Sequence, residues 1–231
     1  MSIKILEIPF VNIKSPEILS RVEEAFSLRQ NIRIATVNPE FLLEATGNSA
    51  FQRSLLGADI RTVDGVGIRI IAWLFGTNLS RVTGADLLLE LLRFAESQDI
   101  PLTIYNQQRS LSAEDDIRDA LGRLYPKLKI CYNKELPEYS LVICSYGAPE
   151  QELFLDILSA HGIKMGVGGA LDYLTGRKKR APRVFRLFGL EWLWRLILQP
   201  RRIKRIFRAV IVFPLRAILD ILKSSKESYG R

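Results

Sequence analysis

Short apolar runs alternate with longer segments of helical periodicity along most of this chain. The runs that predict strands are residues 3–7, 31–37, 60–63, 102–105, 128–131, 141–145 and 163–167. The segments that predict helices are residues 16–29, 39–56, 66–75, 84–97, 111–124 and 150–160. Strands that alternate with helices are typical of a parallel sheet with helices on both faces. We therefore predict an α/β fold with a mostly parallel, Rossmann-like sheet and flanking helices.

The C-terminal part of the chain differs from the rest in charge. Residues 1–176 hold 17 Lys and Arg against 22 Asp and Glu, which gives a net charge of −5. Residues 177–231 hold 16 Lys and Arg against 3 Asp and Glu, which gives +13. We predict an α/β domain over residues 1–176 and a basic, amphipathic helical appendage over residues 177–231.

The pattern of apolar and basic residues within this appendage indicates what kind of surface it binds. Apolar residues would gather on one side of a helix, and Arg195, Arg202 and Arg205 on another. Pro200 predicts a break between two helices, with proline at the first position of the second. A basic amphipathic helix with Trp and Phe is typical of a segment that lies in an anionic membrane surface. A helix packed on its own domain is an alternative, as is a nucleic-acid-binding surface, although no recognised nucleic-acid-binding motif supports the latter.

Other features bear on the compartment. The N-terminal sequence MSIKILEIPF lacks the pattern of a signal peptide. The longest apolar run near the C-terminus, residues 209–222, contains Pro214, Arg216 and Asp220, whereas a spanning helix needs ~20 largely apolar residues. Cys131 and Cys144 lie in apolar runs, as expected of small buried residues in a reducing compartment. We expect a cytoplasmic chain that does not cross the bilayer.

Polar residues and glycines follow several of the predicted strands. Thr36 and Asn38 come at the end of one strand, Asp64 at the end of another, and Gly168-Gly169 after a third. Ligands of open α/β sheets bind outside the carboxyl ends of the strands, although turn chemistry alone also accounts for each residue. Neither Gly166-Val167-Gly168 nor Gly65-Val66-Gly67 completes the GxGxxG fingerprint of dinucleotide-binding proteins, because residues 171 and 70 are not glycine. There is no Asp-x-Asp pair to hold a metal against a diphosphate, so arginines are expected to balance any bound phosphate.

Several ordered segments resemble the WecG/TagA/CpsF family of bacterial glycosyltransferases over roughly residues 5–208. They are residues 36–40, 58–67, 81–86, 147–152, 166–182, 189–196 and 199–202. The resemblance implies an inverting, metal-independent transfer with no cofactor. The donor is commonly UDP-N-acetylmannosamine or its uronic acid, and the acceptor is commonly undecaprenyl-diphosphate-linked N-acetylglucosamine. Products of such enzymes enter teichoic acid linkage units, enterobacterial common antigen or exopolysaccharides.

The resemblance also implies roles for individual residues. Asp64 matches the base that takes the proton of the acceptor hydroxyl, and Thr36 and Asn38 match positions that contact the sugar or the acceptor. The remaining positions are implied to bind substrate: Arg81, Gln151, Gly168, Gly169, Arg195, Arg202 and Arg205. Among these, the appendage arginines are expected to balance the charge of the leaving UDP.

The resemblance further implies a peripheral location on the inner face of the cell membrane. The chain departs from the family pattern at residues 102–110 and 130–135, where expected glycines are missing. This departure leaves open a non-catalytic protein that binds a UDP-sugar or a polyprenyl phosphate. A homo-oligomer also stays open, because the sequence does not locate a self-interface.

Overall fold

The computed structural model describes residues 2–107, 110–132 and 137–229. Within these residues, six parallel strands form one sheet in the order β4-β3-β8-β7-β5-β6. The strands are β3 (Ile32–Val37), β4 (Ile60–Val63), β5 (Leu102–Tyr105), β6 (Ile130–Tyr132), β7 (Ser140–Cys144) and β8 (Gly162–Gly166). The predicted α/β class and parallel sheet are confirmed. The departure at residues 102–110 and 130–135 falls partly on residues 108–109 and 133–136, which lie outside the described residues.

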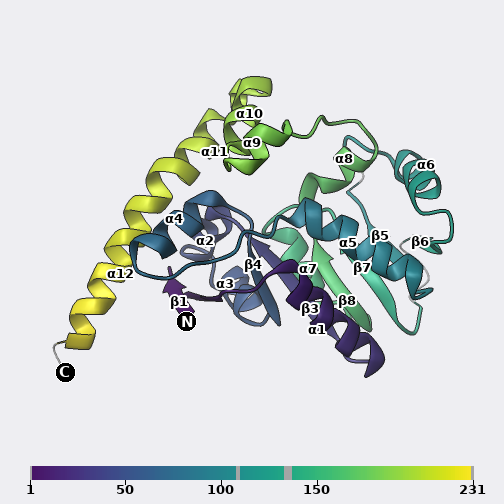
Figure 1. The fold of residues 1–231 in the computed structure, drawn as a ribbon, viewed down its shortest axis with the longest axis horizontal. Helices are drawn as coiled ribbons and strands as arrows, with labels where there is room; N and C mark the ends of the chain where they lie inside the picture. Colours follow the sequence, from purple (N-terminus) through teal and green to yellow (C-terminus); the bar gives the residue numbers. More distant parts are fainter. Residues whose placement is uncertain (1, 108–109, 133–136, 230–231) are drawn as a thin grey trace.

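Helices cover both faces of this sheet (Figure 1). They are α1 (Ser15–Ser27), α2 (Pro39–Ala45), α3 (Ser49–Leu56), α4 (Val66–Leu74), α5 (Gly84–Ser97), α6 (Glu114–Leu124), α7 (Glu150–Ile157) and α8 (Leu171–Leu174). Alternate side chains of β3 enter separate cores, because successive residues of a strand point to opposite faces. Ile32 and Ile34 pack with α1, α5 and α6, whereas Ala35 and Val37 pack with α2, α3 and α4. Burial on both faces explains why the strands read as continuous apolar runs.

Two predicted elements differ from the structure. The single helix predicted over residues 39–56 is two helices, because the Asn48 Oδ1 accepts a hydrogen bond from the Phe51 N–H at 3.0 Å and starts α3 anew. The strand predicted at residues 3–7 belongs instead to an antiparallel hairpin of β1 (Ser2–Ile5) and β2 (Ile8–Val11). Leu6 and Glu7 form its turn with φ of 48° and 69°. Such turns usually carry Asn or Gly, so the sequence held no hairpin signal.

The appendage is helical, as predicted. It comprises α9 (Arg183–Leu187), α10 (Glu191–Leu198), η2 (Pro200–Arg202), α11 (Ile203–Phe207), η3 (Arg208–Val212) and α12 (Phe213–Tyr229). Pro200 does separate two helical parts, at the first position of η2. Figure 1 shows the appendage rising above the body at α9 and α10 and descending along one side as α12. No helix of the described residues is long and apolar enough to cross a membrane.

The long helix α12 packs on the body. Phe213 and Ala217 are fully buried in the same core as Ile68 and Ile71 of α4. The Leu6 N–H at the hairpin turn donates to the Asp220 Oδ2 at 3.0 Å. The body therefore fixes α12, the C-terminal part of the appendage.

Candidate active site

A pocket of about 590 Å³ lies at the carboxyl edge of the sheet, between the body and the appendage. It brings together nine of the ten residues that the sequence predicted as site residues. From the body come Thr36, Asn38, Asp64, Gln151, Gly168 and Gly169, and from the appendage Arg195, Arg202 and Arg205. The parallel strands produce this arrangement, because their carboxyl ends meet at one edge.

Asp64 follows β4 directly and is held there by backbone contacts. Its N–H donates to the Val37 carbonyl at 2.8 Å, and its Oδ2 accepts from the Gly84 N–H at 3.0 Å. Burial raises the pKa of Asp64 from 3.8 to about 6, against the lowering effects of the Gly84 hydrogen bond, Arg81 and Arg195. Such a carboxylate is ionised at neutral pH and still basic enough to share a proton with a hydroxyl in a transition state.

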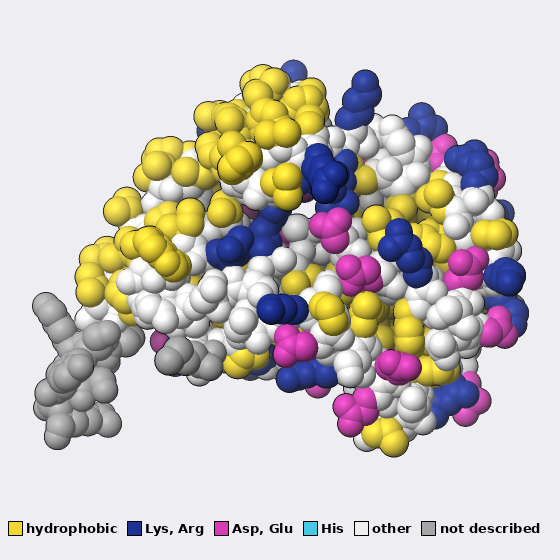
Figure 2. All heavy atoms as spheres, viewed as in Figure 1, with side chains coloured by type: hydrophobic (Ala, Val, Ile, Leu, Met, Phe, Trp, Pro, Cys, Tyr) yellow, Lys and Arg dark blue, Asp and Glu magenta, His cyan; other side chains and the backbone are white. Residues whose placement is uncertain are grey.

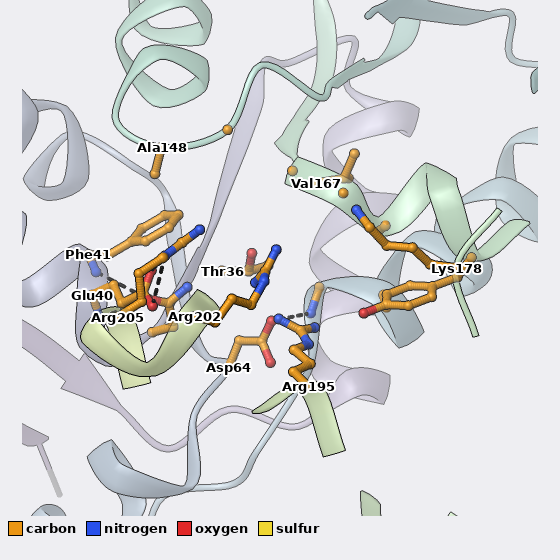
Figure 3. A pocket seen from close by; sticks show the side chains of 18 of the residues that line it. Thr36, Glu40, Phe41, Asp64, Ala148, Val167, Lys178, Arg195, Arg202 and Arg205 are labelled. Atoms are coloured by element: carbon orange, nitrogen blue, oxygen red, sulfur yellow. Dashed lines mark hydrogen bonds and ion pairs between the residues drawn. The ribbon is translucent and has the colours of Figure 1, made fainter. Parts of the chain in front are cut away.

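Thr36 lies beside Asp64 at the end of β3 (Figure 3), and Asn38 follows that strand and lines the same pocket. Thr36 is buried, and a Cβ on Gly84 would come within 3.0 Å of its hydroxyl oxygen, so glycine lets α5 start against it. Asn38 is the N-cap of α2: its Oδ1 accepts from the N–H groups of Glu40 at 2.9 Å and Phe41 at 3.1 Å. The carbonyl oxygen of Asn38 is thus committed to the fold, and its amide NH₂ is the group that it can offer a ligand.

The appendage arginines line the same pocket as these residues. The Arg202 Nε donates to the Gln199 Oε1 at 2.6 Å, and Arg205 pairs with Glu40 through two Nε contacts of 3.1 and 3.3 Å and a third from Nη2. Burial lowers the pKa of Arg202, and the guanidinium groups of Arg205 and Arg195 lower it further. Positive charge is therefore in excess at this wall, which favours an anionic ligand.

A second cationic group lines the pocket and was not assigned from the sequence. Figure 3 shows Lys178 reaching into the pocket from the side opposite Glu40 and Arg205. Its ammonium pairs with the buried Asp172, whose Oδ1 also accepts from the Ser112 hydroxyl at 2.8 Å. The signal was the basic run of residues 177–180 just after Gly176. Trp194 and Glu40 are pocket residues that the sequence analysis likewise left unassigned.

Arg81 stands apart from the other predicted site residues. It is not among the residues that line the pocket. Its Nη1 donates to the Arg186 carbonyl at 3.0 Å, and its Nη2 pairs with the Glu191 carboxylate. Both side chains of the ion pair are largely buried, at 15% and 16% exposure. Arg81 thus links the body to α9 and α10, and its charge lowers the pKa of Asp64. Its contact with substrate stays a prediction.

The groups that commonly hold metals do not gather in the described part of the chain. No three His, Cys, Asp or Glu residues there are placed to hold a metal ion. Cys131 and Cys144 are unpaired, and burial raises the pKa of the Cys144 thiol to about 12.

The fold and the pocket first define a class: an α/β protein that binds its ligand at the carboxyl edge of a parallel sheet. The chain belongs to the glycosyl transferase WecG/TagA/CpsF family, whose model matches residues 3–227. It is similar to an N-acetylglucosaminyldiphosphoundecaprenol N-acetyl-beta-D-mannosaminyltransferase of Bacillus spizizenii. The two chains are 31% identical over 219 residues, which cover 86% of this chain and 84% of the relative. The predicted family is confirmed, and the protein is a glycosyltransferase.

Proposed function

We propose that this enzyme transfers N-acetylmannosamine, or a related sugar, from a UDP-sugar to a lipid-diphosphate-linked sugar. The acceptor that fits the similarity best is undecaprenyl-diphosphate-linked N-acetylglucosamine, because the relative is named for that acceptor and for the mannosaminyl group. The observation that carries the proposal is the placement of Asp64, with a pKa of about 6, in one pocket with three arginines. A proton acceptor and cations that line one pocket suit a reaction in which a hydroxyl displaces a diphosphate.

The proposed reaction is a single displacement. The acceptor hydroxyl oxygen forms a bond to the anomeric carbon of the sugar, while the bond from that carbon to the diphosphate oxygen breaks. The hydroxyl proton passes to Asp64, and the bonding electron pair leaves with UDP. Attack from the face opposite the leaving group inverts the configuration at the anomeric carbon.

We assign the charge of the leaving UDP to side chains and not to a metal ion. Arg195, Arg202 and Arg205 line one wall and Lys178 another. Guanidinium groups pair with phosphate oxygens in bidentate geometry, and donors aimed at developing charge supply much of the stabilisation in such transfers. The Arg205 guanidinium already pairs with Glu40, so a bound ligand would compete with that carboxylate. Arg195 and Arg202 carry no carboxylate partner among the ion pairs of the described residues.

The exposed apolar residues of the appendage support a peripheral place on the inner face of the cell membrane. Figure 2 shows hydrophobic side chains gathered over α9 and α10 and along α12. This apolar band comprises Val184, Leu187, Phe188, Ile197, Leu198, Ile203, Phe207, Ile211, Leu215 and Leu219, each more than a third exposed. The band belongs to a segment of net charge +13. Apolar side chains beside Lys and Arg suit an interface with anionic lipids, where a lipid-linked acceptor would meet the pocket. The products would then enter a bacterial cell-surface polymer.

The test is UDP release from a panel of UDP-sugars, with a short-chain lipid-diphosphate-GlcNAc acceptor, in the presence and absence of EDTA. We expect acceptor-dependent release that survives EDTA, with UDP-N-acetylmannosamine or its uronic acid as the best donor. Release that EDTA abolishes would overturn the metal-independent part. UDP binding without release from any donor would favour the alternative of a non-catalytic binding protein.

A further inference from the structure

Two glycine turns at the ends of neighbouring strands form part of the pocket floor. Gly147 follows β7 with φ of +81°, and Gly168 follows β8 with φ of +49°. Both line the pocket, and β7 and β8 are paired up to Cys144 and Gly166. Backbone in this conformation is accessible to glycine but is not stabilised by it, so something else must hold the two turns in place.

One side chain joins these turns. The Oε1 of Gln151, in the first turn of α7, accepts from the Gly147 N–H at 3.1 Å and from the Gly168 N–H at 2.9 Å. The Gln151 side chain is buried, and its amide oxygen has no further capacity for a ligand once two donors occupy it. Gln151 therefore acts on the pocket through the backbone, and direct contact with the donor is not its main role.

The neighbouring residue sets the orientation of the Gln151 amide. The Oε1 of Glu152 accepts from the Gln151 Nε2 at 2.8 Å. An amide has nearly the same shape in its two orientations, so its hydrogen-bond partners decide which end points where. Were the amide reversed, its NH₂ would meet the two N–H groups of the turns and its oxygen would meet the Glu152 carboxyl oxygen. Glu152 thus excludes the orientation in which both turns lose their acceptor.

This arrangement needs room that only glycine gives. A Cβ at Gly166 would lie 2.6 Å from the Glu152 Oε1 and closer still to the Gln151 amide nitrogen. The two side chains therefore stack directly on the backbone of β8, beneath the pocket.

The Glu152 carboxyl is costly for stability alone. It is 2% exposed, and its Oε2 has no hydrogen-bond partner in the described residues. Burial raises its pKa to about 7, although Arg33 of β3 and the Gln151 amide oppose that shift. A methionine would fill similar space without the penalty of a buried, half-satisfied carboxyl. The carboxyl is better explained by what it orients.

We infer that Glu152 is a positioning residue, which fixes the Gln151 amide so that its oxygen holds both glycine turns and keeps the pocket floor in shape for the donor. The inference rests on the proposed function only in taking that donor to be a UDP-sugar. The hydrogen bonds that carry it do not depend on the reaction.

The experiment compares Glu152→Gln, which keeps an acceptor oxygen, with Glu152→Met, which removes it at similar size. The readouts are amide hydrogen exchange in peptides that cover residues 145–151 and 166–170, and the KM for the UDP-sugar against kcat. In Glu152→Met we expect faster exchange in both peptides and a KM raised about tenfold, as for the loss of one or two hydrogen bonds. Glu152→Gln should restore both values to near those of the parent.

Unchanged exchange in Glu152→Met would overturn the inference, as would a Glu152→Gln protein as impaired as Glu152→Met. A fall in kcat that follows the folded fraction, with KM unchanged, would also count against it. If Glu152→Met fails to fold, Glu152→Ala takes its place. Gln151→Met, which removes the acceptor of both turns directly, gives the exchange rate that it should approach. If the parent protein releases no UDP from any donor, the proposed function fails, whereas the exchange comparison still decides the role of Glu152.

Discussion

The two walls of the pocket are built in different ways. On the body wall, polar side chains are tied to backbone groups of the fold: Asn38 caps α2, Asp64 accepts from Gly84, and Gln151 holds two turns. On the appendage wall, the Arg202 side chain donates to the neighbouring Gln199, and Arg205, which pairs with Glu40, is largely exposed. Backbone-anchored groups keep their geometry without a ligand, whereas exposed ion pairs contribute little and exchange partners easily. The comparison indicates a rigid wall for chemistry and an adjustable wall for charge.

The largest effect is expected from a substitution in the rigid wall. In Asp64→Asn the Oδ1 amide oxygen can still accept from Gly84, but no group remains to take the hydroxyl proton. We expect kcat to fall by about 10²- to 10⁴-fold, which is the usual contribution of a general base. UDP affinity, measured by calorimetry, should change little because the arginines remain. Full turnover in Asp64→Asn would show that Asp64 is not the base.

The raised pKa of Asp64 predicts the pH dependence of activity in the parent and of stability in Asp64→Asn. In the parent, kcat/KM should fall as the pH drops through about 6, because protonated Asp64 cannot accept a proton. The folded protein binds this proton more tightly than the unfolded chain does. The raised pKa therefore lowers the free energy of unfolding progressively as the pH rises from 3.8 to about 6, and the full loss is present above about pH 6. Asp64→Asn should therefore melt at a higher temperature than the parent at pH 7.5, and the gain should vanish below pH 4. A lower melting temperature at pH 7.5 would contradict the raised pKa of the Asp64 carboxyl.

The next effect concerns charge on the adjustable wall. Arg202 lines the pocket, whereas the adjacent Arg201 is exposed and does not. We expect Arg202→Ala to lower kcat/KM by about 10- to 100-fold, as for a lost charged hydrogen bond, and Arg201→Ala to leave it near the parent value. The two variants remove equal charge from the same turn. Equal losses of kcat/KM would mean that these arginines act through general electrostatic attraction and not through their place in the pocket.

The sequence predicted pocket residues on both walls, and Arg81 of the body is the predicted site residue that does not line the pocket. Strand ends follow from local apolar runs, and parallel strands place Thr36 and Asp64 at one edge whatever the details of packing. The position of Arg81 depends on contacts 105 and 110 residues away, with Arg186 and Glu191, and no local pattern reports such distances. The hairpin of β1 and β2 was missed for a different reason, because Leu6 and Glu7 adopt positive φ without the usual turn residues.

The appendage itself shows both outcomes. Its helices and the break at Pro200 follow from periodicity and from the fixed φ of proline. The burial of Phe213 and Ala217 does not, because an apolar side of a helix looks the same in sequence whether it meets lipid or its own domain. Packing and membrane contact were alternatives for the whole appendage, yet the structure packs one part of it and leaves another part apolar and exposed.

The buried pair of Arg81 and Glu191 sharpens the comparison, because it joins the two walls. Arg81 lowers the pKa of Asp64 and Glu191 raises it. Arg81→Met should therefore move the acidic limb of the pH–rate profile to higher pH, and Glu191→Gln should move it to lower pH. Both variants should also speed hydrogen exchange over residues 183–198, since breaking a buried ion pair leaves a charge without its partner. Shifts of the limb in the same direction would mean that the pair acts on Asp64 only through appendage docking.

The smallest expected effect lies on the outer surface of the adjustable wall. Leu187 and Phe188 are 73% and 71% exposed in the apolar band, whereas Ile157, at the end of α7, is 80% exposed and not part of it. Leu187→Ser and Phe188→Ser should each weaken binding to vesicles that contain anionic lipid by about five- to tenfold, from the loss of roughly 1–1.5 kcal/mol of apolar burial. Ile157→Ser, which loses similar apolar surface, should leave vesicle binding unchanged. Turnover of a short-chain acceptor without vesicles should be equal in all three variants, because none of these side chains lines the pocket. If Ile157→Ser weakened vesicle binding as much as Phe188→Ser, the apolar band would not be the membrane contact.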